Sequence, residues 1–233
     1  MKYHRQNYDI DKICPLWTDY QVVKLVKPNS KVLEIGCATG YIGKYLKEKV
    51  NCESWGVEID PDSAEMAKPY YQKILVGNIE NEQILQQIDR KFDFILCMNV
   101  LEHLVNPLGV LQKIKKFLAP AGRVIITLPN IAHFSIRVRL LFGKFDYEDY
   151  GILDNTHLRF FTLKTAKEMI ESSGLKIEHL SIDPDKGIPR FHGVFLRIPG
   201  GWKFLKKIYS LCPTLFGYQF IFVLTDIGSK GNA

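Results

Sequence analysis

The stretch at residues 31–43 constrains the fold of this chain more than any other. It reads Lys-Val-Leu-Glu-Ile-Gly-Cys-Ala-Thr-Gly-Tyr-Ile-Gly, which predicts a buried strand, a tight turn and then a helix. Glycine has no Cβ, so such a turn lets backbone N–H groups and a helix N-terminus approach a ligand closely. The dinucleotide fingerprint G-x-G-x-x-G would place its second glycine where this chain has Ala38. The pattern is instead Glu34-x-Gly36-x-x-x-Gly40.

A second predicted strand ends in acidic residues. Residues 55–60 read Trp-Gly-Val-Glu-Ile-Asp, and Glu58 stands 22 residues after Gly36. Nucleotide-binding sheets carry a carboxylate about 20 residues after the glycine turn, where it accepts hydrogen bonds from ribose hydroxyls. Glu58 and Asp60 could instead open the next helix as its N-cap and first-turn acid. We assign the ribose contact to Glu58 and the helix cap to Asp60.

Alternating strands and helices continue along the chain. Further strands are predicted at 74–79, 92–97, 123–128, 175–182 and 216–225, and helices at 18–27, 61–69, 81–88, 107–118 and 163–173. Alternating units of this kind form parallel sheets, whose ligands lie beyond the carboxyl ends of the strands. One rim is therefore expected to gather Gly36, Glu58, Asn78, the residues from Met98 to His103, and Pro129-Asn130.

Three motifs on these elements resemble those of the class I S-adenosyl-L-methionine (SAM)-dependent methyltransferases, and the resemblance covers about residues 30–182. The motifs are Glu34-x-Gly36-x-x-x-Gly40, Gly77-Asn78-Ile79 and Asn99-Val-Leu-Glu-His-Leu104. The resemblance implies an α/β fold with a Rossmann-like, mostly parallel seven-stranded sheet. Helices would cover both faces, the last strand would be antiparallel, and a lid insertion would follow strand five. It also implies SAM as cofactor and S-adenosyl-L-homocysteine (SAH) as product.

The family's cofactor contacts carry over to matching positions of this chain. Asn78 matches the position whose side chain meets the adenine amino group, and an Asn oxygen can accept that hydrogen bond as an Asp oxygen does. The backbone near Met98 and Asn99 would lie against the methionine part of SAM. The cofactor-binding residues that we expect are Glu34, Gly36, Cys37, Ala38, Gly40, Glu58, Ile59, Asn78, Ile79, Met98 and Asn99.

The residues after strand four contain a candidate catalytic base. His103 can take a proton from a hydroxyl group near neutral pH, because the pKa of imidazole lies in that range. Some relatives use such a residue to position the substrate, without proton transfer. The structural alternative is that Glu102 and His103 cap or brace the helix that starts near Pro107.

The segment 129–162 lies between strand five and the next helix, a position that covers the cofactor rim in this fold. We expect an acceptor pocket or lid, with His157 as a second candidate base, Asp154 as an orienting carboxylate and Arg159 as an anion clamp. His133 is a further candidate for substrate contact, and aromatic residues of the segment can stack on sugar rings. The alternative is a structural network in which Arg159 pairs with Asp154.

This segment also resembles part of the methyltransferases of bacterial glycan and cell-surface polysaccharide synthesis, and of the related methionine-biosynthesis-protein type. The likeness rests on Pro129-Asn-x-x-His133 followed by Asp154-x-Thr-His-Leu-Arg-Phe-Phe-Thr162. It implies a sugar-like methyl acceptor.

Length and cysteine usage favour one intracellular domain. At 233 residues the chain suits a single α/β domain. We divide it into an N-terminal leader and helix (1–29), a SAM-binding core (30–128), the acceptor-site insertion (129–162) and a C-terminal part (163–233). Its five cysteines are scattered without C-x-x-C spacing, so neither a disulfide framework nor a metal site is expected. The sequence shows no secretory or membrane-spanning pattern, which predicts a cytoplasmic location.

The formal net charge of +6 comes mostly from the C-terminal part. Basic residues elsewhere are mixed with acids, so we expect no nucleic-acid partner. The segment 202–209, Trp-Lys-Phe-Leu-Lys-Lys-Ile-Tyr, is amphipathic and basic. It would touch an anionic membrane surface peripherally, pack as a helix under the lid, or form an ordinary solvated face. Monomer and homodimer both stay open.

These motifs indicate an enzyme that transfers the SAM methyl group to an oxygen of a small polar acceptor, such as a sugar hydroxyl. Substrate positioning supplies much of the rate of such a displacement, and a base is needed only for a neutral hydroxyl. One alternative is methylation of nitrogen or carbon, or a methionine-pathway role, with the same cofactor site. Another is a catalytically silent SAM-binding partner protein. A nicotinamide-dependent sugar dehydrogenase is disfavoured by Ala38.

Overall fold

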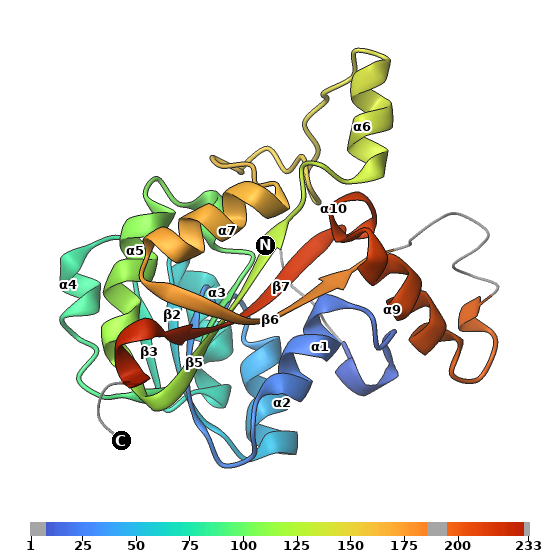
Figure 1. Ribbon diagram of the computed structural model, residues 1–233. Helices are drawn as coiled ribbons and strands as arrows, with labels where there is room; N and C mark the ends of the chain where they lie inside the picture. Colours follow the sequence, from blue (N-terminus) through green and yellow to red (C-terminus); the bar gives the residue numbers. More distant parts are fainter. Residues whose placement is uncertain (1–7, 186–194, 231–233) are drawn as a thin grey trace.

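A seven-stranded β-sheet runs through the centre of the computed structural model, which describes residues 8–185 and 195–230 (Figure 1). Its strands are β1 (Lys31–Ile35), β2 (Glu53–Glu58), β3 (Lys73–Val76), β4 (Phe92–Met98), β5 (Leu118–Pro129), β6 (Leu175–Asp183) and β7 (Gln219–Asp226). They are ordered β3-β2-β1-β4-β5-β7-β6. Strands β1 to β5 pair in parallel, and β7 runs antiparallel between β5 and β6. The predicted fold class is confirmed.

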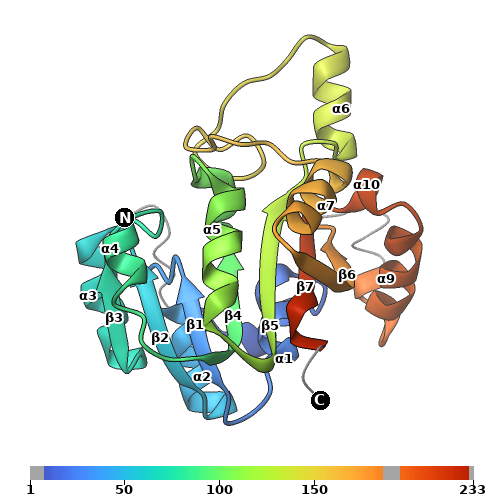
Figure 2. The same ribbon diagram turned by 60° about the vertical axis from the view of Figure 1, so that its left-hand side comes forward.

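Helices cover both faces of this sheet (Figure 2). They are α1 (Thr18–Leu25), α2 (Tyr41–Val50), α3 (Pro61–Ala67), α4 (Glu82–Leu85), α5 (Pro107–Ile114), α6 (Phe134–Leu141), α7 (Leu163–Ser172), α9 (Gly201–Leu211) and α10 (Pro213–Phe216). The apolar side chains of α4, α5 and α7 pack on one face, and those of α1 and α2 pack on the other. The sheet is therefore the middle of three layers.

Strand β1 shows how the sequence fills both faces. Successive side chains of a strand point to opposite faces. Val32 packs with α1 and α2, whereas Leu33 and Ile35 pack in the cluster that contains α4 and α5. Glu34 stands between Leu33 and Ile35 in the sequence, so its side chain points to the same face as Val32, where it is buried. A buried carboxyl group needs a hydrogen-bond partner, because an unpaired one costs free energy.

The start of strand β5 differs from the sequence prediction. We expected the preceding helix to reach residue 118 and a turn to fill 119–122. Helix α5 instead ends at Ile114, a 3-10 turn follows, and β5 begins at Leu118. Leu118 pairs with Phe92 of β4, and the register then shifts by a bulge. A Cβ at Gly122 would lie 2.9 Å from the Phe92 carbonyl oxygen, so the close approach of the two strands requires glycine there.

Several other helices and strands are shorter than predicted. Helix α3 ends at Ala67 and gives way to a 3-10 turn, and α4 spans only one turn of the predicted 81–88. The closing strand begins at Gln219 and not at 216, because Pro213 opens the short helix α10. Helix α7 begins as expected, with Thr162 as its N-cap in a capping box. The first seven residues of the predicted leader lie outside the described part of the chain.

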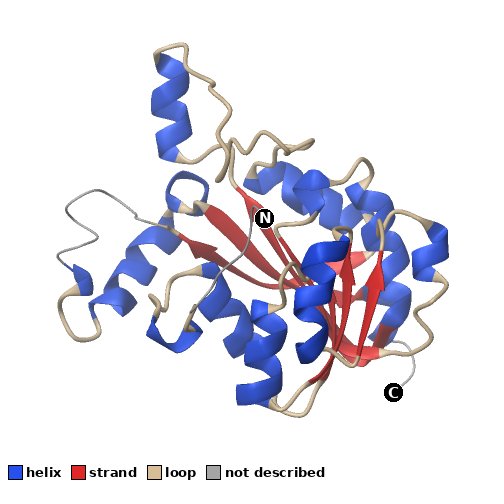
Figure 3. Ribbon diagram, turned by 180° about the vertical axis from the view of Figure 1, so that it is seen from behind, coloured by secondary structure: helices blue, strands red, loops and turns tan. Residues whose placement is uncertain are grey.

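The segment between β5 and α7 leaves the sheet and returns to it. The Ile131 N–H donates a hydrogen bond to the Phe161 carbonyl at 3.0 Å, so the two ends of the segment lie together. Between them α6, which the sequence patterns did not predict, stands clear of the other helices in all three ribbon views (Figure 3). Its Val138 and Leu141 side chains are exposed. The insertion therefore has one limb near the sheet and one that projects from it.

Helix α9 contains the predicted amphipathic segment. Leu205 and Tyr209 are fully buried in the main core, whereas Lys203, Lys206 and Lys207 are exposed. Within residues 8–185 and 195–230, none of the helices has the length and apolar character needed to cross a bilayer.

Candidate functional site

The glycine turn after β1 has an unusual backbone. Gly36, Ala38 and Gly40 have φ values of +73°, +46° and +81°, a region that costs little only for glycine. Side chains also have no room at the two glycines. A Cβ at Gly36 would lie 2.5 Å from a methyl carbon of Val100, and one at Gly40 would lie 2.9 Å from Ala67. The turn therefore requires the two glycines of the sequence pattern.

The turn leads directly into helix α2. Gly40 is the N-cap of this helix and supplies no side-chain hydrogen bond. The first N–H groups of a helix have no partner within the helix and carry a partial positive charge. The start of α2 therefore presents backbone donors near the carboxyl end of β1, whereas most N–H groups of the turn itself donate within the protein.

Glu58, at the end of β2, is bound to the same turn. Its carboxylate accepts hydrogen bonds from the N–H groups of Ala38 at 2.7 Å, Ile59 at 2.9 Å and Asp60 at 3.0 Å, and the residue is 8% exposed. Asp60 caps α3 by accepting a hydrogen bond from the Ser63 N–H at 3.1 Å. The predicted cap at Asp60 is thus confirmed, and Glu58 is held beside the glycine turn. Ile59, in contrast, points its side chain to solvent.

Glu34 has a partner within the protein. It accepts a hydrogen bond from the Tyr71 hydroxyl at 2.6 Å, and burial raises the pKa of the Glu34 carboxyl to about 8. Cys37 packs with Ala67 and Tyr71, so its side chain also points into the protein. The cofactor contact expected of Glu34 stays a prediction, while its observed contact joins β1 to Tyr71, which follows the 3-10 turn after α3.

A stability prediction follows from the buried Glu34. Its pKa is raised from 4.5 to about 8 in the folded protein, so this residue favours folding most at low pH. That contribution is lost as the pH rises through about 8. We expect Glu34→Gln, which stays neutral and can still accept from Tyr71, to flatten the fall in unfolding free energy between about pH 5 and pH 9. Denaturant unfolding measures this.

The matched control is Glu53→Gln. Glu53 is an exposed carboxylate whose pKa is lowered by its hydrogen bond with Arg90. Its replacement should leave the fall in unfolding free energy between about pH 5 and pH 9 in place. A constant difference between wild type and Glu34→Gln across this pH range would contradict the assignment.

The ends of β3 and β4 complete the predicted rim. The Asn78 side-chain oxygen accepts a hydrogen bond from the Glu80 N–H at 2.9 Å, and Asn78 is half-buried. Asn99 has φ of +52°, its N–H donates to the Thr127 hydroxyl, and its side-chain oxygen accepts from Gln219 of β7. The predicted contacts Ile79 and Met98 are buried, each in one of the two large apolar clusters. Their side chains belong to the core.

The residues after β4 form a 3-10 turn, Leu101–His103, that pairs with the insertion. The Glu102 carbonyl accepts hydrogen bonds from the N–H groups of Leu158 at 2.9 Å and Arg159 at 3.0 Å. This pairing brings His157 to His103, with ring centroids 4.8 Å apart and ring planes at 69°. The two predicted bases, 54 residues apart in sequence, thus lie together.

Hydrogen bonds indicate the tautomers of both histidines. His157 Nδ1 lies 3.0 Å from the Ile152 carbonyl oxygen, and His103 Nδ1 lies 3.2 Å from the Thr156 carbonyl oxygen. A carbonyl only accepts, so Nδ1 carries the proton in each ring. Nε2 then carries the lone pair of the neutral imidazole. In both rings the basic nitrogen is therefore Nε2.

The Glu102 side chain lies beside the two histidines. Its side chain is 1% exposed, and its Oε2 has no hydrogen-bond partner. Burial raises the pKa of the Glu102 carboxyl to about 8. The N-cap of α5 is Asn106, which accepts a hydrogen bond from the Gly109 N–H at 2.9 Å. The alternative in which Glu102 or His103 caps this helix is therefore wrong.

The remaining predicted substrate residues have structural contacts. His133 is 4% exposed and is the N-cap of α6, and burial lowers the pKa of its imidazole to about 4. Asp154 accepts hydrogen bonds from the N–H and hydroxyl of Thr156. Arg159 donates from Nη2 to the Val105 carbonyl at 2.8 Å. His133 therefore stabilises the insertion from within, whereas the exposed Arg159 lies at the rim.

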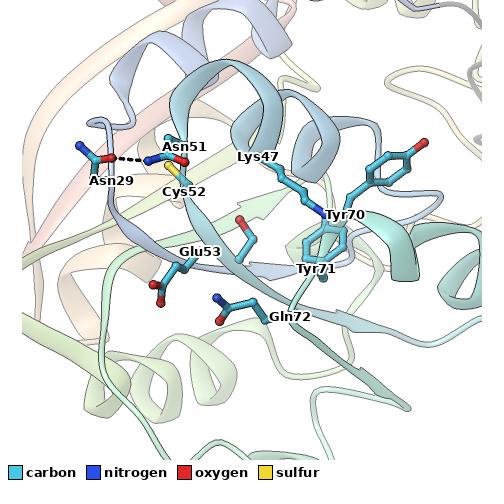
Figure 4. Close-up of a pocket in the computed structure, with 9 residues that line it drawn as sticks. Asn29, Lys47, Asn51, Cys52, Glu53, Tyr70, Tyr71 and Gln72 are labelled. Carbon is cyan, nitrogen blue, oxygen red and sulfur yellow. Dashed lines mark hydrogen bonds between the residues drawn. The ribbon is translucent and has the colours of Figure 1, made fainter.

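Two cavities lie away from this rim. One of about 420 Å³ is at the amino end of β2 (Figure 4), lined by Asn29, Lys47, Asn51, Cys52, Glu53, Ser54, Tyr70, Tyr71 and Gln72. The other, about 390 Å³, lies between β6 and α9. Neither contains a predicted site residue. The rim is favoured as the functional site, because the motif residues converge there.

Sequence reasoning missed three parts of this arrangement. Glu102 was considered only as a helix brace, although it directly precedes His103. Thr156, which links Asp154 to His103, was not singled out within Asp-x-Thr-His. No sequence pattern marks Gln219, because its contact with Asn99 depends on the pairing of β7 with β5.

The fold and the motif turn define a class I methyltransferase. The chain belongs to the methyltransferase-domain family, whose model matches residues 5–180, and SAM is its cofactor.

Relatives cover different shares of the chain. An uncharacterised protein of Methanocaldococcus jannaschii is 30% identical over 161 residues, which are 68% of this chain and 71% of that protein. The ubiquinone biosynthesis O-methyltransferase of Dechloromonas aromatica is 25% identical over 127 residues, 53% of each protein. The chain thus spans about half the length of the ubiquinone-biosynthesis relatives that it matches. The structure of the magnesium protoporphyrin IX methyltransferase of Synechocystis with bound SAH has a TM-score of 0.56 at 12% identity, covering 89% of this chain and 78% of that one. This last likeness shows the fold.

Proposed function

We propose that the protein transfers the methyl group of SAM to a hydroxyl oxygen of a small, sugar-like acceptor. The observation that carries this proposal is the pairing of His103 with His157 at the end of β4, with both rings oriented by carbonyl groups. A neutral hydroxyl must lose a proton when it attacks, and an imidazole nitrogen near the rim can promote that loss. The pair therefore marks where the acceptor binds.

The cofactor would lie on the neighbouring part of the rim. In our proposal Glu58 holds the ribose, Asn78 meets the adenine, and the backbone of the turn from Gly36 to Gly40 and of Asn99 forms the rest of the cradle. These groups fit SAM because no side chain caps the first N–H groups of α2, and Glu58 holds its carboxylate oxygens beside the turn. SAM supplies an electrophilic methyl carbon on a positive sulfur.

Aromatic side chains beside His157 favour a ring-shaped acceptor. Phe160 lies 6.2 Å from the His157 ring and 5.8 Å from Phe145, between ring centroids. Tyr147 is 58% exposed and packs edge-on against Phe145. Flat apolar faces of this kind can stack on sugars or planar groups. The name O-methyltransferase on several relatives supports oxygen as the methylated atom. We further propose a cytoplasmic location.

Labelled SAM tests the proposal. The protein is incubated with methyl-labelled SAM and either nucleotide-sugar and glycan pools or simple catechols, and products are identified by mass spectrometry. We expect label in a sugar methyl ether. Label only in a catechol would overturn the sugar class while keeping O-methylation, and label on nitrogen or carbon would overturn O-methylation. Absence of label from a protein that binds SAM, with all pools, would favour a silent SAM-binding partner.

A further inference from the structure

Three possible metal ligands converge at the rim. Glu102, His103 and His157 each place one ligand atom within 4.8 Å of the other two. Ligands on a single ion with bonds of about 2.1 Å lie about 3.4 Å apart in a tetrahedral arrangement. Modest side-chain rotations would therefore bring all three onto one ion. This set was not expected from the sequence, because His157 lies 54 residues after His103 and meets it only through the pairing of the insertion with Glu102.

The buried carboxylate of Glu102 has an unmet hydrogen-bonding need. Its Oε2 is the only carboxylate oxygen among the described residues that is fully shielded from solvent without a hydrogen-bond partner. A buried polar atom without a partner is unfavourable and calls for an explanation, such as an ion. The helix-cap explanation fails, since Asn106 has that role. A bound cation would satisfy this oxygen.

Each of the two histidines makes the second hydrogen bond that is typical of a metal-binding imidazole. A metal-binding histidine usually donates its other ring N–H to a carbonyl or carboxylate, which fixes its tautomer and orientation. Nδ1 of His157 meets the Ile152 carbonyl, and Nδ1 of His103 meets the Thr156 carbonyl and hydroxyl. The Thr156 hydroxyl in turn donates to Asp154. Both rings then carry the lone pair on Nε2, which is the form of imidazole that binds metals.

We propose that Glu102, His103 and His157 bind a divalent transition-metal cation that holds the acceptor hydroxyl. Two imidazoles and one carboxylate suit first-row cations and leave coordination positions for a substrate. The cation would hold the hydroxyl by its oxygen and ease loss of the proton, which passes to water. The oxygen then forms the bond to the methyl carbon, and the carbon–sulfur electron pair stays on sulfur. This inference deepens the proposed function and rests on it for the acceptor. It replaces direct proton removal by an imidazole: the two Nε2 atoms serve as ligands, and the cation promotes the loss of the proton.

Metal binding is measured directly on the whole 233-residue chain after EDTA treatment. Mn²⁺ is the probe, because its free form is counted by electron paramagnetic resonance, and Zn²⁺ is the competitor. We expect one Mn²⁺ per chain, displaced by Zn²⁺. Glu102→Gln, which keeps the shape of the side chain, and His157→Asn should each weaken Mn²⁺ binding at least tenfold. His179→Asn, at an exposed histidine on β6, should leave it unchanged.

Thermal unfolding of each variant shows that the fold is kept. Thr156→Val adds a readout of the supporting contacts, since it removes the hydroxyl between His103 and Asp154 and should weaken binding less than loss of a ligand. Failure of the wild type to bind either cation, or equal binding by all variants, would overturn the proposal. Methyl transfer that persists in EDTA would overturn the metal role and keep the proposed function. Metal binding that the ligand variants abolish, with no methyl transfer to any acceptor, would instead overturn the proposed function.

Discussion

Replacing Gly36 by valine is expected to abolish measurable SAM binding. The backbone at Gly36 has φ of +73°, which a β-branched residue adopts only with strain. The added Cβ would also lie 2.5 Å from Val100 Cγ2, at the end of β4. The new side chain would therefore push the turn after β1 away from the residues that follow β4. Calorimetric titration with SAM measures the loss, which we expect to exceed about a hundredfold, or about 3 kcal/mol.

Gly143→Val is the matched control for backbone strain. Gly143 has a similar φ of +69°, and a Cβ there would meet nothing within 4 Å. This variant therefore introduces the same kind of substitution away from the turn and should keep wild-type SAM affinity. A second variant pair, Gly36→Ala with and without Val100→Ala, tests the contact itself. Wild-type SAM affinity in a folded Gly36→Val protein would remove this turn from the cofactor site.

Loss of either paired histidine should reduce turnover without affecting SAM binding. His157→Asn keeps an amide donor near the Ile152 carbonyl but removes Nε2, so it isolates the group that faces the acceptor. General base catalysis contributes roughly 10²- to 10⁴-fold, and we expect kcat to fall by at least 10²-fold. The same fall is expected for His103→Asn. Single-turnover rates with the acceptor found by labelling, together with SAM affinity, give the two readouts.

His179→Asn serves again as the control, because His179 is exposed on β6. A His157→Gln variant, which places an amide near the former Nε2, should recover less than the wild-type rate because an amide is no base. Turnover of His157→Asn within about twofold of wild type would return His157 to the structural residues. Its contacts with Phe160 and the Ile152 carbonyl would then be its whole role.

Local patterns in the sequence predicted the core of the fold. The apolar run before Gly36 is β1, and the helix predicted to follow is α2. The division of roles between Glu58 and Asp60 had a local basis too, since a cap faces the next three residues. The cap was confirmed. These features depend on contacts between near neighbours or on strand alternation, which a single sequence records.

The features that the sequence patterns did not predict depend on contacts between residues that are far apart in the chain. The early start of β5 depends on pairing of Leu118 with Phe92, and the meeting of His103 with His157 depends on how the insertion returns to Glu102. Projection of α6 from the sheet likewise follows no local pattern. Burial of His133 was missed, because a histidine at a helix start looks the same whether solvent or protein covers it.

Titration of the purified protein with SAM in a calorimeter tests the central claim most directly. Our account predicts one SAM per chain with a dissociation constant on the order of micromolar, competition by SAH, and loss of the signal in Gly36→Val but not in Gly143→Val. A folded wild-type protein that gives no binding heat at several temperatures, and no competition with SAH, would contradict the assignment of the rim formed by Gly36, Glu58 and Asn78.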